Sequence, residues 1–156
     1  LTVRDEMKVV LQRVGSAQVR VDDAEIGRIG PGLVVFVGVG KEDGSEDVDY
    51  MVGKIRELRI FGDDTGRMNR SVVETGGELL VVSQFTLCGD CRRGRRPSFD
   101  SAAPPNHARV LYDELVANLR ASGLKVATGR FQAMMDVELV NDGPVTLIVE
   151  SRVQGD

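Results

Sequence analysis

The pattern of apolar and polar positions predicts a sheet built from short strands. Residues 8–14, 18–21 and 25–29 favour strands, with a turn at Asp22-Asp23. Residues 33–39 are apolar throughout, which is typical of a strand covered on both faces. Further strands are predicted at 79–82, 125–127, 133–140 and 145–149, the last two being separated by a turn at 141–144.

Two segments have the three- and four-residue apolar spacing of amphipathic helices. The first spans about 45–58, and Asp43 followed by Glu46 suits its N-terminus. The second spans about 105–122, with a proline at its start and Gly123 just past its end. Each helix has a single apolar stripe. We therefore predict an α+β fold of layered β-sheets with two amphipathic helices packed on one side.

Length and composition indicate one domain and a reducing compartment. We interpret residues 1–6 as an upstream extension, residues 7–151 as a single domain and residues 152–156 as a C-terminal tail. No run of 18 or more apolar residues predicts a membrane helix, and residues 1–6 lack the apolar centre of a signal peptide. Two cysteines cannot build a disulfide framework. We expect a cytoplasmic location, with no membrane partner.

A net charge of −4 and a pI near 5.1 argue against a general nucleic-acid binder, and so against DNA as a partner. One segment is an exception, since four arginines lie within five residues: Arg92, Arg93, Arg95 and Arg96. Gly94 and Pro97 keep this segment irregular. Two interpretations stay open, a solvated charged loop or a contact surface for phosphates.

Three motifs suggest chemistry that the rest of the chain does not support. Gly38–Gly40 lies where a dinucleotide-binding loop would, but the third glycine, Gly44, comes one residue late. Cys88 and Cys91 have the spacing of half a zinc site and lack the remaining ligands. His107, the only histidine, falls at a half-exposed position of the second helix. We therefore expect no metal, no cofactor and no histidine base.

Four segments mix apolar strand with residues that strand packing does not require. They are Ser83-Gln84-Phe85-Thr86-Leu87, Gly94-Arg95-Arg96-Pro97-Ser98-Phe99, Gly129-Arg130-Phe131-Gln132-Ala133-Met134-Met135 and Asn141-Asp142-Gly143-Pro144-Val145-Thr146. Together they resemble the D-aminoacyl-tRNA deacylase family, whose S-Q-F-T-L and N-x-G-P-V-T motifs frame its active site. Gln132 departs from the pattern, because many relatives have glycine there. The resemblance implies a barrel-like sheet in the single domain.

The resemblance also implies an activity, namely hydrolysis of the ester bond of D-aminoacyl-tRNA, and of glycyl-tRNA mischarged on alanine tRNA, without cleavage of L-aminoacyl-tRNA. Backbone N–H groups near Gln84, Phe85 and Thr86 would hold the scissile carbonyl, and the 2′-hydroxyl of the substrate would assist. The implied catalytic segment consists of Ser83, Gln84, Phe85 and Thr86.

By the same resemblance, chirality is selected by a cis Gly143-Pro144 peptide that reaches into the active site of a partner subunit in a homodimer. The implied substrate-binding residues are Gly143, Pro144, Val145, Thr146, Ala133 and Met135. Arg13 would hold the partner's Gly-Pro loop, and the four arginines at 92–96 would contact the acceptor end of tRNA. Two alternatives remain: a non-catalytic RNA-binding homodimer, and a zinc or thiol protein built on the two cysteines.

Overall fold

The structure is a computed structural model that describes residues 6–151. Its strands are β1 (Lys8–Val21), β2 (Ala24–Ile29), β3 (Gly32–Gly38), β4 (Phe61–Gly62), β5 (Met68–Arg70), β6 (Glu78–Ser83), β7 (Val126–Thr128) and β8 (Asp136–Glu150). Its helices are α1 (Ser45–Glu57), α2 (Val72–Thr75) and α3 (Pro105–Ala121), with a 3-10 turn, η1 (Phe85–Cys88). The proposed extension at 1–6 and tail at 152–156 lie, except for Glu6, outside the described residues.

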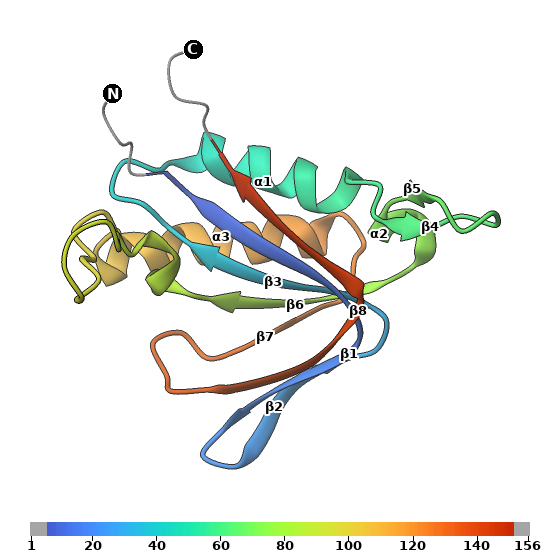
Figure 1. The fold of residues 1–156 in the computed structure, drawn as a ribbon, viewed down its shortest axis with the longest axis horizontal. Coiled ribbons are helices and arrows are strands. Elements are labelled where there is room, and N and C mark those ends of the chain that lie inside the picture. Colours follow the sequence, from blue (N-terminus) through green and yellow to red (C-terminus); the bar gives the residue numbers. More distant parts are fainter. Residues whose placement is uncertain (1–5, 152–156) are drawn as a thin grey trace.

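One six-stranded sheet forms the centre of the molecule. Its order is β2-β1-β3-β6-β7, and β8 pairs with β1. β1 pairs with β3 through its first half and with β2 through its second half, while β8 follows it along both halves (Figure 1). β3, β6 and β7 are mutually parallel, the other pairs antiparallel. The sheet curls into the barrel-like form that the resemblance implied.

The sheet buries apolar residues on both of its faces. In β6, Leu79 and Val81 belong to the cluster under the helices, while Leu80 and Val82 belong to a second cluster. The second cluster lies between the sheet and its own curled portion, since its other buried members come from β1, β2 and β3, and residues of β7 and β8 pack against it. A strand covered on both faces must be apolar at every position, which explains the composition of β3 and β6.

Both predicted helices are confirmed, and they pack against each other over one face of the sheet (Figure 1). The predicted cap of the first helix was wrong by one position. Gly44 is the N-cap of α1, and Asp47, not Glu46, accepts a hydrogen bond from the Gly44 N–H at 2.9 Å. Asp43 instead accepts from the Gly40 N–H at 2.6 Å, closing the turn between β3 and α1.

The strand boundaries differ from the sequence prediction in two places. β1 is one continuous strand across residues 15–17, and β8 is one strand across the predicted turn at 141–144. Residues 142–145 bulge from the ladder, because Gln12 pairs with Thr146 and Val14 with Asn141. The pattern therefore located an interruption correctly, but the chain continues in the same direction after it. The turn at Asp22-Asp23 is confirmed, both residues having positive φ.

Candidate active site

The segment that follows β6 turns sharply into η1, which presents residues 84–86 at the end of the sheet. The Gln84 N–H donates to the Val37 carbonyl oxygen at 2.7 Å, continuing the β3 and β6 pairing by one residue. Gly38 lies directly behind η1. A Cβ atom there would stand 2.9 Å from Leu87 Cβ and 3.1 Å from the Gln84 carbonyl oxygen. The close approach of η1 to β3 therefore requires glycine at position 38.

This segment exposes hydrogen-bond donors at its start. Among residues 6–151, the backbone N–H groups of Phe85 and Thr86 have no hydrogen-bond partner, as expected for the first turn of a helix. The Gln84 amide donates to the Thr86 hydroxyl. No histidine or carboxylate contacts that hydroxyl in the described chain, so Thr86 has no partner that would activate it as a nucleophile.

His107 makes its hydrogen bond outside this segment. Its Nε2 lies 2.8 Å from the Asp43 carbonyl oxygen, where it ties the start of α3 to the turn before α1. The ring is half-buried, as the sequence predicted. The geometry thus assigns this histidine to packing between the two helices.

The arginine-rich segment is a loop closed beside η1. Asp90 and Ser98 form an antiparallel bridge across its base, with N···O distances of 2.7 and 2.9 Å. Beyond the bridge, the Phe99 ring packs edge-on against Phe85, the centroids being 5.2 Å apart. The aromatic pair therefore fixes the loop against the candidate catalytic segment. The sequence analysis includes Phe99 in one of the four segments but does not predict its contact with Phe85.

The four arginines of the loop are all exposed but do not have the same environment. Arg92 donates two side-chain hydrogen bonds to Asp90, at 2.7 and 2.9 Å, and these lower the pKa of Asp90 to about 2. Arg93, Arg95 and Arg96 make no ion pair with any described residue. Three of the four charges are thus free to meet an anion from solution.

The Gly143-Pro144 peptide is cis, as the resemblance implied. It forms the bulge of β8, where Gly143 has a φ of 133° that L side chains rarely adopt. Arg13 contacts this loop in its own chain, its Nε donating to the Asp142 carbonyl oxygen at 3.1 Å and its Nη1 to the Ile60 carbonyl oxygen at 2.6 Å. Within its own chain Arg13 therefore holds the Gly-Pro loop, and its contact with the loop of a partner stays a prediction.

Three polar side chains brace the bulge from the other side. Gln12 and Asn141 both donate to the Thr146 hydroxyl, at 3.1 and 2.9 Å, and the Val145 N–H donates to the Asn141 side-chain oxygen at 2.9 Å. The loop is exposed, yet its base is tied to β1 by side-chain hydrogen bonds. These contacts explain why the N-x-G-P-V-T motif needs both its asparagine and its threonine.

Within one chain the Gly-Pro loop and the segment after β6 are far apart. The loop lies opposite Arg13 of β1. Across the sheet, Arg13 pairs with Leu33 of β3, and Leu33 pairs with Leu79 of β6. Ser83 lies four residues beyond Leu79 in β6, which is roughly 13 Å along the strand. β6 is also three strand spacings from β8, which is about 14 Å across the sheet. A single chain therefore does not bring the two candidate parts of the site together.

Two further predicted substrate-binding residues lie beside the second core. Met135 packs against that cluster, and its sulfur lies 3.4 Å from the Arg130 backbone nitrogen. The Ala133 N–H donates to the Arg130 carbonyl oxygen at 3.2 Å, closing the turn that leads into β8. Gln132 in this turn has a φ of 62°, which explains why glycine suits the same position in relatives.

The two cysteines differ in exposure. Cys88 is buried in η1, its Sγ 3.5 Å from the Val39 carbonyl oxygen, whereas Cys91 is exposed, and the two cysteines form no disulfide. Within the described residues no group of three or more His, Cys, Asp or Glu side chains could hold a metal ion.

Comparison with known proteins identifies the family. Residues 10–150 match the family model described as D-Tyr-tRNA(Tyr) deacylase. The chain belongs to this family. A D-aminoacyl-tRNA deacylase of Heliobacterium modesticaldum is 61% identical over 146 residues, which are 94% of this chain and 97% of the relative. The family and the barrel-like α+β fold expected from the sequence are thereby confirmed.

Two solved structures have the same fold. A c-Myc DNA Unwinding Element Binding Protein has a TM-score of 0.89 and 39% identity, and the match covers 94% of this chain and 99% of that one. A probable eukaryotic D-amino acid tRNA deacylase has a TM-score of 0.81 over 92% of this chain and 98% of that one. At 19% identity, the second likeness concerns the fold alone.

Proposed function

We propose that this protein is a D-aminoacyl-tRNA deacylase, which hydrolyses the ester between a D-amino acid, or glycine, and the terminal ribose of tRNA. The observation that carries the proposal is the pair of unpartnered N–H groups at Phe85 and Thr86, exposed at the end of β6 beside a loop of free arginines. The relatives named above are D-aminoacyl-tRNA deacylases. A role in translation favours a cytoplasmic location. Among the described residues, no helix is long and apolar enough to span a membrane.

The chemistry needs placement more than a strong nucleophile. An aminoacyl ester is already activated, so a water molecule and donors for the developing oxyanion are sufficient. The N–H groups of Phe85 and Thr86 supply these donors, and the Gln84 amide fixes the Thr86 hydroxyl next to them. The substrate's own 2′-hydroxyl assists the water. Thr86 then positions the substrate and forms no covalent intermediate.

Chiral selection requires a second copy of the chain. The Gly143-Pro144 loop is exposed and remote from Ser83 in its own chain, so it can enter only a partner's site. In the described residues β8 pairs with β1 alone, which leaves its other edge open, and it exposes Val140 and Ile148. Exposed apolar side chains on an open edge strand favour association. In the homodimer, main-chain atoms of the loop exclude L side chains.

The arginine loop at 92–96 binds the acceptor end of tRNA. Its bridge at Asp90 and Ser98 and the packing of Phe99 on Phe85 hold the free charges beside the donors at residues 85 and 86. Binding through phosphates is independent of sequence and weakens with salt. This suits an enzyme that must accept many tRNAs.

The first experiment measures release of D-tyrosine from D-tyrosyl-tRNA, with L-tyrosyl-tRNA as the matched substrate. We expect release from the D ester alone. Binding of both tRNAs without release would instead support the non-catalytic RNA-binding homodimer. One zinc per chain in the purified protein would support the alternative built on Cys88 and Cys91.

Mixing two impaired variants tests the shared site. Gly38→Ala damages the η1 side, and Gly143→Ala damages the loop that enters the partner. In a statistical mixture half of the dimers are mixed, and one of their two sites is intact, so the mixture should reach about a quarter of the wild-type rate, which exceeds the mean rate of its two components. If the mixture shows no more than that mean although subunits exchange, the two parts do not form one site between chains.

A further inference from the structure

A cavity beside the candidate active site has an excess of positive charge. It has a volume of about 450 Å³ and lies between α3, β7 and the segment 129–131. Among its lining residues are three arginines and one carboxylate: Arg109, Arg120, Arg130 and Asp113. Formal charges at the rim therefore sum to +2 in a chain whose net charge is −4.

Three other cavities of similar size are balanced in charge. The cavity along α1 is lined by two acidic and two basic side chains. The cavity next to α2 contains Glu78 and Lys125, and the one at the Gly-Pro loop contains Arg13 and Asp142. The cavity at α3 thus differs from these three in its excess of positive charge.

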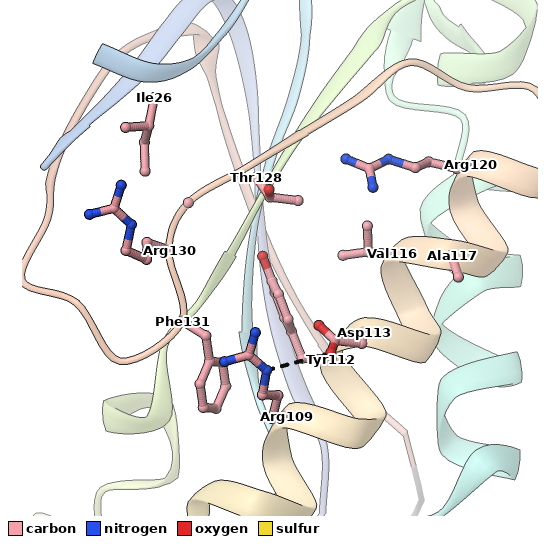
Figure 2. Close-up of a pocket in the computed structure, with 11 residues that line it drawn as sticks. Ile26, Arg109, Tyr112, Asp113, Val116, Ala117, Arg120, Thr128, Arg130 and Phe131 are labelled. Carbon is pink, nitrogen blue, oxygen red and sulfur yellow. Dashed lines mark ion pairs between the residues drawn. The ribbon is translucent and has the colours of Figure 1, made fainter. Parts of the chain in front are cut away.

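The three arginines are held around the rim in different ways. The Cζ atom of Arg109 lies 5.4 Å from the centroid of the Phe131 ring, and its Nε lies 3.6 Å from Asp113 Oδ2. Arg120 Nη2 donates to the Val126 carbonyl oxygen at 3.0 Å. Arg130 makes no ion pair with any residue of 6–151. Figure 2 shows Arg109 and Arg120 on α3 and Arg130 across from them on the segment that follows β7. Their spacing around the rim suits a chain of anionic groups better than one small anion.

The floor of the cavity is tied to the strand that carries the candidate catalytic segment. The Tyr112 hydroxyl donates to the Val81 carbonyl oxygen at 2.7 Å, and the Gly129 N–H donates to the same oxygen at 3.4 Å. Val81 precedes Ser83 by two residues of β6, which is about 7 Å along the strand. The floor of the cavity therefore lies about 7 Å along β6 from the start of the candidate catalytic segment.

We infer that this cavity binds the phosphate backbone of the tRNA acceptor arm, as a second contact in addition to the loop at 92–96. The inference rests on the proposed function, because tRNA is the polyanion whose end must lie at residues 84–86. Guanidinium groups match phosphate oxygens with two hydrogen bonds each, and Asp113 limits the affinity so that product tRNA can leave. Phosphate contacts add affinity without reading sequence.

The test compares four single variants by their dissociation constants for uncharged tRNA across salt concentrations. Arg109→Gln and Arg130→Gln remove cavity charges, Asp113→Asn removes the opposing one, and Arg59→Gln is the matched control from the balanced cavity along α1. Each phosphate contact adds a slope of about −0.7 in log K against log salt, so losing one weakens binding roughly 8-fold at 50 mM salt and about 3-fold at 200 mM. Asp113→Asn should tighten binding, and Arg59→Gln should match the wild type.

Hydrolysis of a phosphate-free substrate separates binding from chemistry. With a D-tyrosyl ester of adenosine, kcat/KM should be the same in the wild type and in both arginine variants. The inference is overturned if Arg109→Gln and Arg130→Gln keep the salt slope of the Arg59→Gln control, or if Asp113→Asn binds tRNA no more tightly. If the wild type binds tRNA with this salt dependence and releases no D-tyrosine, the proposed function fails and the cavity assignment stands.

Discussion

Gly38→Ala is expected to damage the candidate active site from behind, because the new Cβ would press on η1 from the side of β3. The added Cβ would lie 2.9 Å from Leu87 Cβ, 3.1 Å from the Gln84 carbonyl oxygen and 3.3 Å from Cys88 Sγ. Ordinary contacts of a Cβ begin near 3.4 Å. Because two of these three atoms belong to the backbone or lie next to it, no side-chain rotation relieves the overlap. The 3-10 turn must move away from β3 by roughly half an ångström.

The magnitude follows from that displacement. Overpacking of this kind costs about 1–3 kcal/mol of the free energy of unfolding. A misplacement near 1 Å at a reacting centre costs on the order of 100-fold in rate, so half of it should lower kcat roughly 10-fold. The effect on kcat should thus exceed what the loss of stability alone would produce at 25 °C.

Urea unfolding and deacylation of D-tyrosyl-tRNA measure the two effects separately. Gly15→Ala is the control, because a Cβ at Gly15 meets nothing within 4 Å. This variant should keep the wild-type rate and stability. Wild-type kcat and stability in Gly38→Ala, or equal damage in Gly15→Ala, would refute the assigned role of the Gly38 contact.

Three further predictions concern packing, ionisation and the Gly-Pro loop. Leu115→Ala should lower the free energy of unfolding by about 2–5 kcal/mol, because the side chain is 0% exposed between α3 and the sheet. Burial raises the pKa of Tyr112 to about 12, so the unfolded chain loses this proton first as the pH rises above 10. Stability should then fall by about 1.4 kcal/mol per pH unit from pH 10 to 12, and Tyr112→Phe should remove that slope. Gly143→Ala should abolish discrimination or activity, since its Cβ would lie 2.9 Å from Val145 Cγ2 and 3.0 Å from Arg13 Nη2, at a strained φ.

Each of these has a measurement that decides it. Urea titration checks the core variant, and a cost below about 1 kcal/mol would contradict the packing described here. Denaturant midpoints from pH 9 to 12 check the tyrosine, for which Tyr50→Phe is the control because that side chain is 40% exposed. Rates on the D and L esters check the loop, and an unchanged ratio and rate would contradict its role.

The sequence predicted those elements that have a regular period of their own. α1 and α3 were located because their apolar stripes repeat over three or more turns, and β3 because every position in it except Phe36 is buried. The four-residue elements α2 and η1 were missed, since so short a segment has no period to detect. The continuity of β1 was missed because its buried face changes near Val14, where the register against β8 shifts.

The candidate site could be predicted only as separate motifs. Ser83–Thr86 and Gly143–Pro144 were recognised from their residues, but their separation depends on pairing between strands that are more than 40 residues apart in sequence. The contact of Arg13 with Asp142 follows from the same pairing, so the sequence could not tell whether its loop was in its own chain. The cavity at α3 was missed altogether, because its arginines are scattered along the sequence and share no motif.

β1 and β8 both contribute residues to both hydrophobic clusters, and this affects how the protein unfolds. Val9 lies in the cluster under the helices and Val19 in the other, while β8 pairs with β1 beside each of them. Unfolding around either cluster would therefore break the β1–β8 pairing that the other cluster also depends on. Heat should unfold the molecule in one calorimetric step, and amide protons of β1 should exchange with solvent at the same slow rate on both sides of Gly15.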